Sequence, residues 1–298
     1  MSYAATEPTT DTSPISPWWR QAVILVMILG FTLLTIVTVK TYSGAPPIPA
    51  QVVDEAGRVV FLEADVNKGQ EVFFKYGLME HGTLWGHGAY LGPDYTAEYL
   101  HRLAEIAQDT EANRLFGKPV AQLTRGQASE VVDAVKRLLK QNRYDATTRT
   151  LTFTEAERAS FDRQKGEWQA YFGGATGAPG LPAKFIKSEQ ELAALNAYFA
   201  WATWATVALR PGTGYSYTNN WPYEPLVGNT PTSSAFLWSG LSLVSLLGGL
   251  GLVLFIFGKF NFLGWSGGEG RTSGFTGTLR DWVLTPSQKA LALFFAVV

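Results

Sequence analysis

The sequence predicts a mainly α-helical membrane protein with a soluble outer domain between two transmembrane helices. Two observations indicate this: uncharged apolar runs at 21–39 and 235–257, and a polar stretch between them that is rich in helix-capping patterns. Nineteen helical residues reach roughly 28 Å, which is enough to cross the hydrocarbon core of a bilayer. The expected divisions are a cytoplasmic N-terminus at 1–20, a transmembrane helix at 21–40, an outer domain at 41–234, a second transmembrane helix at 235–257, a cytoplasmic loop at 258–289 and the start of a further transmembrane helix at 290–298.

The first apolar run has two interpretations, an uncleaved anchor and a signal peptide. Arg20 and Lys40 bracket the run, and two tryptophans stand just before it, as in an aromatic belt. A signal peptide has a shorter apolar core, usually about 7–15 residues, after a basic segment. Here the preceding stretch carries Glu7 and Asp11. The anchor is therefore the favoured interpretation.

The second run sets the orientation of the chain. Its glycines permit close helix packing in lipid, and the loop after it contains four basic residues against two acidic ones. Because cytoplasmic loops carry an excess of Lys and Arg, residues 41–234 are expected outside the membrane. The last residues, ALALFFAVV, begin another apolar run, so we expect the chain to be the N-terminal piece of a longer polytopic protein. A short helix at the membrane interface is the alternative.

Local patterns predict the elements of the outer domain. Val66, Phe73 and Phe74 are the apolar positions of its first helix, and two Ser/Thr-x-x-Glu capping boxes open its last two. The expected elements are a strand at Arg58–Leu62, a helix from Asp65 to about Tyr76, a glycine-rich loop at 77–92, a helix at Asp94–Asp109, a helix from Thr124 to about Asn142, a strand at Thr147–Phe153, a helix from Thr154 to about Phe172 and a helix from Ser188 to about Leu209.

The composition excludes several classes of site. The chain has 298 residues, no Cys and a formal net charge of −1. Without Cys there are no disulfides, zinc-thiolate sites, iron–sulfur clusters or thioether-attached haem. The near-neutral balance argues against a nucleic-acid partner, because phosphate binding needs a surplus of Lys and Arg. No phosphate-binding loop, nucleophile elbow or His-Glu-x-x-His motif is present.

Three histidines remain as candidates for metal or acid–base chemistry. His81 and His87 are six residues apart, which would place them on opposite faces of a helix, although a glycine-rich loop could bring them together. Two His without Cys or nearby carboxylates are a weak transition-metal signal. We expect exposed loop histidines at both positions. For His101, on a helix, we expect a structural or solvated role.

An aromatic stretch precedes the second apolar run. Its rings suit a membrane interface or a docking surface, and packing or anchoring is favoured over ligand contact. An aromatic-lined quinone entrance is conceivable, but the spacing does not support it. The residues are Tyr198, Trp201, Trp204, Tyr215, Tyr217, Trp221 and Tyr223.

The order of these features resembles the quinol-dependent nitric oxide reductases, the single-chain branch of the haem–copper oxidase superfamily. The most specific segment is 201–229, WATWATVALRPGTGYSYTNNWPYEPLVGN. The loop Thr83–Tyr90 is similar to one that follows a Cys-x-x-Cys-His motif in the related cytochrome c subunits. The positions of that motif read Leu78-Met79-Glu80-His81-Gly82 here, so both Cys and the axial His are missing and His81 is not expected to bind haem. The resemblance implies a haem-free cytochrome c-like outer domain, without c-type haem and with quinol as the electron source.

The resemblance also implies one metal contact. In the related two-subunit enzymes, a backbone carbonyl and a Tyr of this loop bind a calcium ion that bridges the haem propionates. The matching residues are Gly88 and Tyr90. Calcium accepts backbone oxygens, and glycine allows close approach of the loop. The alternative is that Gly88 and Tyr90 only shape a turn that packs against the helix bundle.

The implied reaction is the reduction of two nitric oxide molecules to nitrous oxide and water. The resemblance places haem b, haem b3 and a non-haem iron in the full-length protein, with ligands beyond residue 298, so no catalytic residue is expected in this piece. Expected partners are membrane lipid, quinol, nitric oxide, the C-terminal catalytic bundle of the same chain and, as an option, a second copy in a homo-oligomer. The expected location is the bacterial inner membrane, with the outer domain in the periplasm. The alternatives are a membrane-anchored sensing or binding module and a structural subunit of a respiratory complex.

Overall fold

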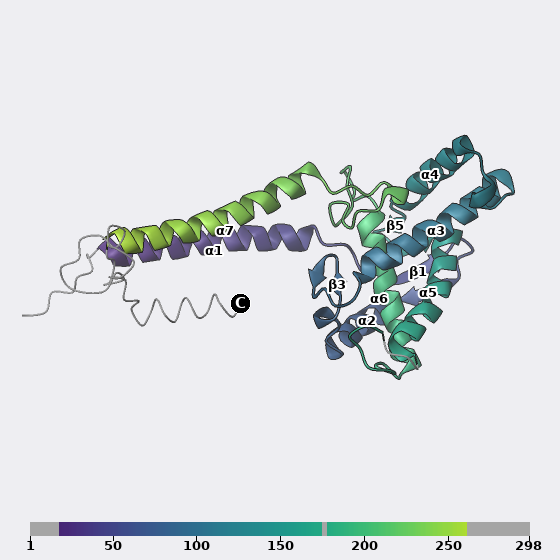
Figure 1. Ribbon diagram of the computed structural model, residues 1–298, viewed down its shortest axis with the longest axis horizontal. Helices are drawn as coiled ribbons and strands as arrows, with labels where there is room; N and C mark the ends of the chain where they lie inside the picture. The colour runs from purple at the N-terminus through teal and green to yellow at the C-terminus, as the bar shows by residue number, and fades with distance from the viewer. Residues whose placement is uncertain (1–17, 175–177, 261–298) are drawn as a thin grey trace, which may run out of the picture. The chain divides into compact units, whose positions relative to one another are not determined.

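The computed structural model describes residues 18–174 and 178–260 of the chain (Figure 1). Most of the predicted cytoplasmic N-terminus, nearly all of the predicted 258–289 loop and the apolar run at 290–298 lie outside these residues. The chain divides into two units, 1–230 and 231–298.

Among the described residues, each unit has one helix that is long and apolar enough to cross a membrane. In the first unit α1 spans Trp18–Ser43, and in the second unit α7 spans Ser233–Phe260. Both are long and apolar enough to cross a membrane, with mean hydropathies of 2.8 and 2.3 over Gln21–Ser43 and Ser233–Phe260. Most of their described apolar side chains, from Val23 to Val39 and from Phe236 to Ile256, are exposed. The two predicted apolar runs are therefore confirmed as helices.

A small four-stranded sheet forms one side of the outer domain. Its strands are β1 (Gln51–Asp54), β2 (Val59–Leu62), β5 (Tyr144–Asp145) and β6 (Thr150–Phe153), in the order β2-β1-β6-β5. β1 and β6 are parallel, with Val52 opposite Leu151, and both of these side chains are fully buried. The predicted strand at 58–62 corresponds to β2, and the one at 147–153 is shortened to β6 because its first residues form the turn after β5.

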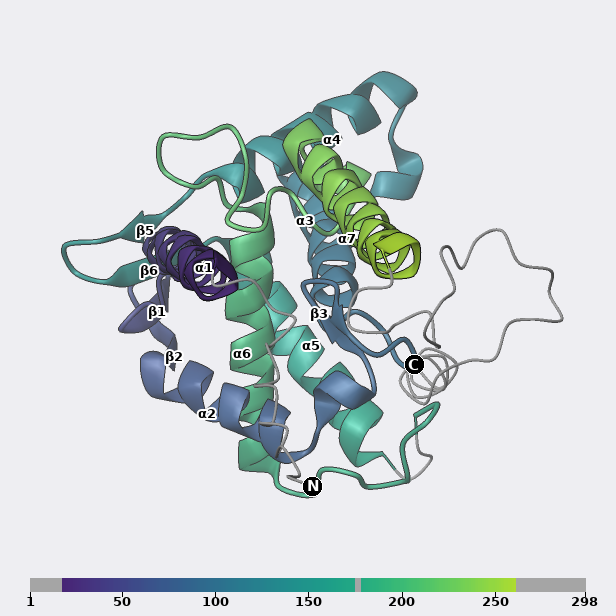
Figure 2. The same ribbon diagram turned by 90° about the vertical axis from the view of Figure 1, so that its left-hand side faces the viewer.

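The core of the domain is built around one buried helix. α6 (Glu189–Val207) contacts α2 (Glu63–Lys75), α3 (Tyr95–Phe116) and α5 (Glu155–Gly173), which lie around it in Figure 2. All but one of the residues from Leu192 to Val207 are buried. A helix that is apolar on all sides is stable only when neighbours cover every face. α4 (Arg125–Lys140) packs on α3 and completes the helical layer.

Four of the five predicted helix starts are confirmed, and one start and one capping box are corrected. The side chains of Asp94, Thr124, Thr154 and Ser188 each accept a hydrogen bond from the backbone N–H three residues later. Asp65 does not cap α2 but lies in its first turn, where its carboxylate accepts from Leu62 N at 2.8 Å. Glu191 does not complete a capping box, because Lys75 and Tyr76 bind its carboxylate at 2.6 and 2.9 Å.

Three further expectations differ from the structure. Phe74 is 61% exposed rather than part of the core, whereas Phe73 is buried. α3 continues past Asp109 and ends only where Gly117 adopts a left-handed conformation. The aromatic stretch divides in two, because its first three rings lie on α6 inside the core, while Trp221 and Tyr223 remain 43% and 62% exposed.

Candidate functional site

The glycine-rich loop between α2 and α3 is a folded structure. It begins with one short 3-10 turn (Leu78–Glu80), continues as a two-stranded ribbon of β3 (Thr83–Leu84) and β4 (His87–Gly88), and ends at Asp94, the cap of α3. Figure 1 places β3 at the edge of the domain. The predicted metal contacts Gly88 and Tyr90 lie at the end of this ribbon.

The carboxylate of Asp94 connects the loop to α3. Its Oδ2 accepts from Thr83 Oγ1 and from Gly86 N, both at 2.7 Å. Its Oδ1 accepts from Thr96 Oγ1 and, at 2.8 Å, from Ala97 N. One side chain therefore caps the helix and fixes the ribbon at the same time. The sequence predicts only the helix start at this position.

Close packing holds the loop from its other faces. Gly88 has a φ of +140°, and a Cβ on it would lie 2.2 Å from Gly82 O, so only glycine fits without a shift. Gly86 has a φ of +81° and lies directly against the indole of Trp221. Trp85 Nε1 donates to Ala202 O on α6 at 3.0 Å. The loop is thus a rigid support for the residues that follow it.

That support presents an exposed tip. The side chain of Tyr90 is 90% exposed and that of Leu91 is 69% exposed, although the domain buries most of its other large apolar residues. Tyr90 follows Gly88 by two residues, so a phenol and a backbone carbonyl are available within one short segment. Calcium takes about 6–8 oxygen ligands. Among residues 18–174 and 178–260 no group of three or more His, Asp or Glu is placed to hold a metal, so a cation here needs oxygens from elsewhere.

The two loop histidines lie in different environments. His81 is only 4% exposed, which corrects the expectation of an exposed side chain, and its Nε2 lies 2.9 Å from Tyr171 Oη. Burial lowers the pKa of His81. His87 is exposed, as expected.

His101 lies on α3 and has a structural contact, as predicted. Its Nδ1 is 2.9 Å from Glu224 Oε2, in the segment that leads to α7. The hydrogen bond with this carboxylate raises the pKa of His101. Nearby, Lys140 Nζ donates to Asn229 Oδ1 at 2.8 Å, and burial lowers the pKa of Lys140 to about 8. Lys140 was not among the predicted site residues, because a lysine at a helix end is usually solvated.

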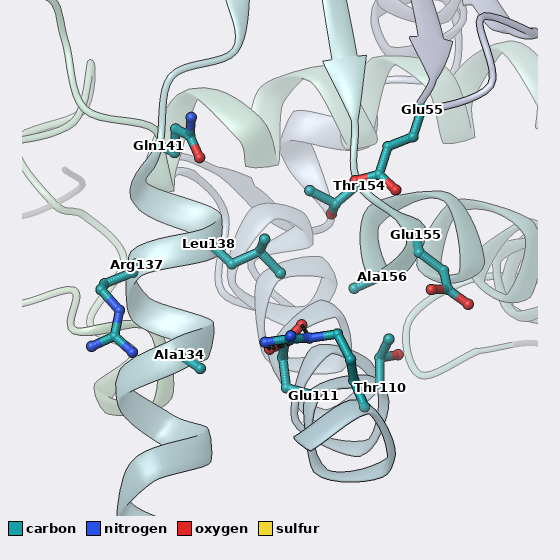
Figure 3. A pocket seen from close by; sticks show the side chains of 11 residues that line it. Glu55, Thr110, Glu111, Ala134, Arg137, Leu138, Gln141, Thr154, Glu155 and Ala156 are labelled. Atoms are coloured by element: carbon teal, nitrogen blue, oxygen red, sulfur yellow. Dashed lines mark hydrogen bonds and ion pairs between the residues drawn. The ribbon is translucent and has the colours of Figure 1, made fainter.

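A pocket of about 380 Å³ lies between α3, α4 and the start of α5 (Figure 3). Its polar side chains include Glu111, which is buried and forms an ion pair with Arg114 at 2.6 Å. Glu155 lies across the pocket, while the side chain of Arg137 points away from it. The lining has no nucleophile–base pair within hydrogen-bond reach, so its geometry indicates no catalytic site.

The comparisons with known proteins identify the family. The family model for the NorB cytochrome c-like domain of nitric oxide reductase matches residues 49–223, which is more than half of the chain. The chain belongs to the NorB family of nitric oxide reductases. The matched range begins just before β1 and includes the whole helical domain and the loop that presents Gly88 and Tyr90. No curated protein matches the chain.

Membership of the NorB family accounts for the general architecture. The matched domain is mostly helical, as the sequence predicted, and it is flanked by the two apolar helices α1 and α7. At the level of the family, the chain is part of an oxidoreductase, a nitric oxide reductase.

Proposed function

We propose that this chain is the N-terminal portion of a quinol-dependent nitric oxide reductase. The complete enzyme reduces two nitric oxide molecules with two electrons and two protons to nitrous oxide and water. Its haem b, haem b3 and non-haem iron, bound by residues beyond 298, would supply the binding and reduction of nitric oxide. The portion described here anchors the enzyme and forms its outer cap.

The observation that carries the proposal is a cytochrome c-like domain in a chain with no Cys. A c-type haem is attached through two Cys and needs an axial ligand. The residues at the corresponding positions form the 3-10 turn Leu78–Glu80, and the following His81 faces Tyr171. A domain that carries no haem cannot relay electrons from a soluble cytochrome, which favours a membrane quinol as the donor.

The interior of the domain supports a fold that is stable without haem. Aromatic rings fill the space between α2, α3, α5 and α6, and the rings of Tyr95 and Phe199 stack at 4.9 Å with an interplanar angle of 8°. Trp168 packs edge-on against Phe199 at 5.1 Å. Such a cluster buries a large apolar area, which stabilises the fold in place of a cofactor.

Gly88 and Tyr90 are proposed as calcium contacts between this domain and the catalytic bundle. The rigid loop and the exposure of Tyr90 support this role, because a phenol oxygen that contacts an ion shared with another domain must be accessible. The remaining oxygens would come from the bundle and the haem propionates. The proposed location is the bacterial inner membrane, with the outer domain in the periplasm. A homo-oligomer is compatible with this arrangement.

The first experiment tests the electron donor. Membranes that contain the full-length protein are supplied with a reduced quinol analogue or with reduced cytochrome c, and nitric oxide consumption is recorded with an electrode. We expect consumption with the quinol and none above background with cytochrome c, together with b-type haem in the pyridine haemochrome spectrum. A haem-free full-length protein would instead favour a sensing module or a structural subunit.

The second experiment tests the calcium contact with two matched variants. Tyr90→Phe removes the phenol oxygen, and Tyr223→Phe removes one from another exposed ring. We expect Tyr90→Phe alone to lower the calcium content of the full-length enzyme and to shift its haem spectrum. If the calcium content of the Tyr90→Phe enzyme is unchanged, the Tyr90 side chain does not bind calcium and the loop has only a packing role.

A further inference from the structure

Tyr171 and His81 form a hydrogen-bonded phenol–imidazole pair that the proposed function does not use. Tyr171 lies in the last turn of α5, and its Oη is 2.9 Å from His81 Nε2. His81 is 4% exposed, and its Nδ1 has no hydrogen-bond partner among the described residues. A phenol that donates to a neutral imidazole can lose its proton to that base when it is oxidised, because both groups are within proton-transfer distance.

The pair lies beside a small opening to solvent. A pocket of about 280 Å³ is lined by Tyr171 and Trp168 and by Leu91, Glu98 and Arg102. Tyr171 is half-buried in its wall, so a small molecule that enters the pocket meets the phenol ring. The pocket has more apolar than polar lining residues, which favours a small, weakly charged molecule.

Aromatic rings continue from the pair into the core. The ring of Trp168 is 5.8 Å from that of Tyr171 and 5.9 Å from that of Tyr95, measured between centroids. Phe73 lies between Tyr95 and Tyr198, with centroid distances of 6.0 and 5.8 Å. The path then reaches Trp201 and Trp85, which are 5.8 Å apart, near the Pro47 carbonyl that Trp201 Nε1 contacts. The aromatic contacts therefore continue without a break from Tyr171 to the Trp201 and Trp85 pair.

The proton acceptor favours Tyr171 over Trp168 as the oxidised residue. The Arg102 guanidinium lies over the Trp168 ring, 5.2 Å from its centroid, but Glu98 and Glu167 each bind Arg102 at 2.7 Å and offset its charge. Trp168 Nε1 has no hydrogen-bond partner among the described residues, whereas the Tyr171 phenol lies against His81 Nε2, so only the tyrosine can pass its proton to a base and become a neutral radical.

Tyr95 and Tyr76 lack a comparable base. Tyr95 Oη faces the Leu78 carbonyl, which does not accept a proton. Tyr76 donates to Glu191 at 2.9 Å, but a carboxylate is a weaker base than an imidazole, and Lys75 binds the same carboxylate at 2.6 Å. The imidazole partner therefore distinguishes Tyr171 from both.

We propose that Tyr171 and His81 are a redox-active pair that takes up one oxidising equivalent from a small one-electron oxidant in the pocket, of the class of nitrogen dioxide. The oxidant gains one electron from Tyr171, and the phenolic proton moves to His81 Nε2, which leaves a neutral tyrosyl radical and an imidazolium. Return of one electron from a soluble one-electron reductant of the class of ascorbate, and of the proton from His81, restores the phenol. This activity is independent of the proposed reductase function.

The test uses the purified full chain with a ruthenium photosensitiser, a sacrificial electron acceptor and electron paramagnetic resonance. Ring-deuterated tyrosine identifies the tyrosyl signal, and ascorbate serves as the reductant that removes it. We expect Tyr171→Phe to lose most of the long-lived tyrosyl signal, whereas Tyr223→Phe, at an exposed ring, keeps most of it. Equal signals in Tyr171→Phe and the unmodified chain would overturn the proposal.

A second variant tests the proton acceptor. His81→Gln retains a hydrogen-bond acceptor but no base, so it should lower the radical yield at neutral pH while Tyr171 remains in place. Circular dichroism and the thermal midpoint verify that each variant is folded. A folded His81→Gln protein with an unchanged yield and lifetime of the radical would show that the imidazole does not take the proton, which also overturns the pair.

Discussion

The Asp94 carboxylate accepts a hydrogen bond from Gly86 N at 2.7 Å and thereby joins the start of α3 to the ribbon that presents Gly88 and Tyr90. The same carboxylate caps α3 through Ala97 N. The loop and the helix are therefore positioned by one residue. A substitution that keeps the helix cap but removes the hydrogen bond from Gly86 N shows how much the order of the loop depends on the Asp94 carboxylate.

Asp94→Asn is expected to loosen the loop while it preserves the helix. Asparagine is as good an N-cap as aspartate, so its oxygen can still accept from Ala97 N. Its amide then faces Gly86 N–H, and two donors cannot bond to each other. We expect faster hydrogen exchange at the Gly86 amide and easier proteolysis near Tyr90, with a loss of about 1–2 kcal/mol in the free energy of unfolding.

Asp94→Ala is the comparison for this prediction, because it removes both the helix cap and the hydrogen bond from the loop. It should cost about 1–2 kcal/mol more than Asp94→Asn, since the cap is lost as well. If the Gly86 amide exchanges its hydrogen at the same rate in the unmodified domain and in Asp94→Asn, packing alone holds the ribbon in place.

His81 is expected to make the domain sensitive to acid. Burial lowers its folded pKa below the ordinary value of 6.5. The unfolded state then binds a proton more readily, so the free energy of unfolding decreases as the pH falls below 6.5 and levels off below the folded pKa. Chemical denaturation between about pH 8 and 5.5 should show this decrease, and His81→Gln should reduce it.

His101 provides a contrast of opposite sign. The Glu224 carboxylate raises its folded pKa, so its contribution is present below the ordinary pKa and is lost as the pH rises through the folded value. His101→Gln should therefore lower the stability at pH 5.5 more than at pH 8. If His81→Gln and His101→Gln change the pH profile in the same direction, the assignment of His81 as a buried neutral side chain is wrong.

The features that the sequence predicted are local ones. The caps at Asp94, Thr124, Thr154 and Ser188 depend on residues only three positions apart, and the two apolar helices depend on composition alone. The features that it missed join distant positions. β1 has only four residues and acquires its place by pairing with β6, about a hundred residues later. His81 and Tyr171 are likewise separated by 90 positions, so no local pattern reveals their contact.

Only part of the candidate site was predictable from the sequence. The resemblance identified Gly88 and Tyr90, and the structure supplies the reason for glycine at 88, a left-handed backbone without room for a Cβ. The supports of the loop, Asp94 and Trp221, were not assigned to it. Their contacts depend on how the chain returns to the loop, which local spacing does not encode. Whether Gly88 and Tyr90 contact calcium stays a prediction.

Gly69 is expected to be required for the contact between α2 and α6. A Cβ at this position would lie 2.2 Å from Ala194 O and 2.5 Å from Tyr198 Cβ, so alanine forces the helices apart. We expect Gly69→Ala to lower the free energy of unfolding by about 1–3 kcal/mol despite the higher helix propensity of alanine. The matched control is Gly166→Ala on the exposed face of α5, where no atom lies within 4 Å and the change should stabilise the domain by about 0.4–1 kcal/mol. Equal effects of the two variants, measured by urea denaturation, would contradict the close helix contact.

The ion pair between Arg143 and Glu157 is expected to be the most sensitive charged contact of the domain. Arg143 Nη2 is 2.6 Å from Glu157 Oε2, and the carboxylate is 3% exposed. The same arginine donates to the Leu138 and Thr152 carbonyls, so it connects α4, β6 and α5. Arg143→Ala leaves a buried carboxylate without its cation, which typically costs about 3–5 kcal/mol.

An exposed pair on the same helix is the control for Arg143→Ala. Arg158 and Asp162 are 2.8 Å apart on α5, and the two side chains are 34% and 55% exposed. Solvent screens such a pair, so Arg158→Ala should change the free energy of unfolding by less than about 1 kcal/mol. Thermal and urea denaturation of both variants at neutral pH measure the difference. Comparable losses of unfolding free energy in Arg143→Ala and Arg158→Ala would mean that the environment of Glu157 is more solvated than its burial indicates.

Glu157→Gln distinguishes the two cases. In a solvated environment it should leave the free energy of unfolding nearly unchanged. In a desolvated one it should destabilise the domain, because Arg143 keeps its charge while the opposite charge is gone.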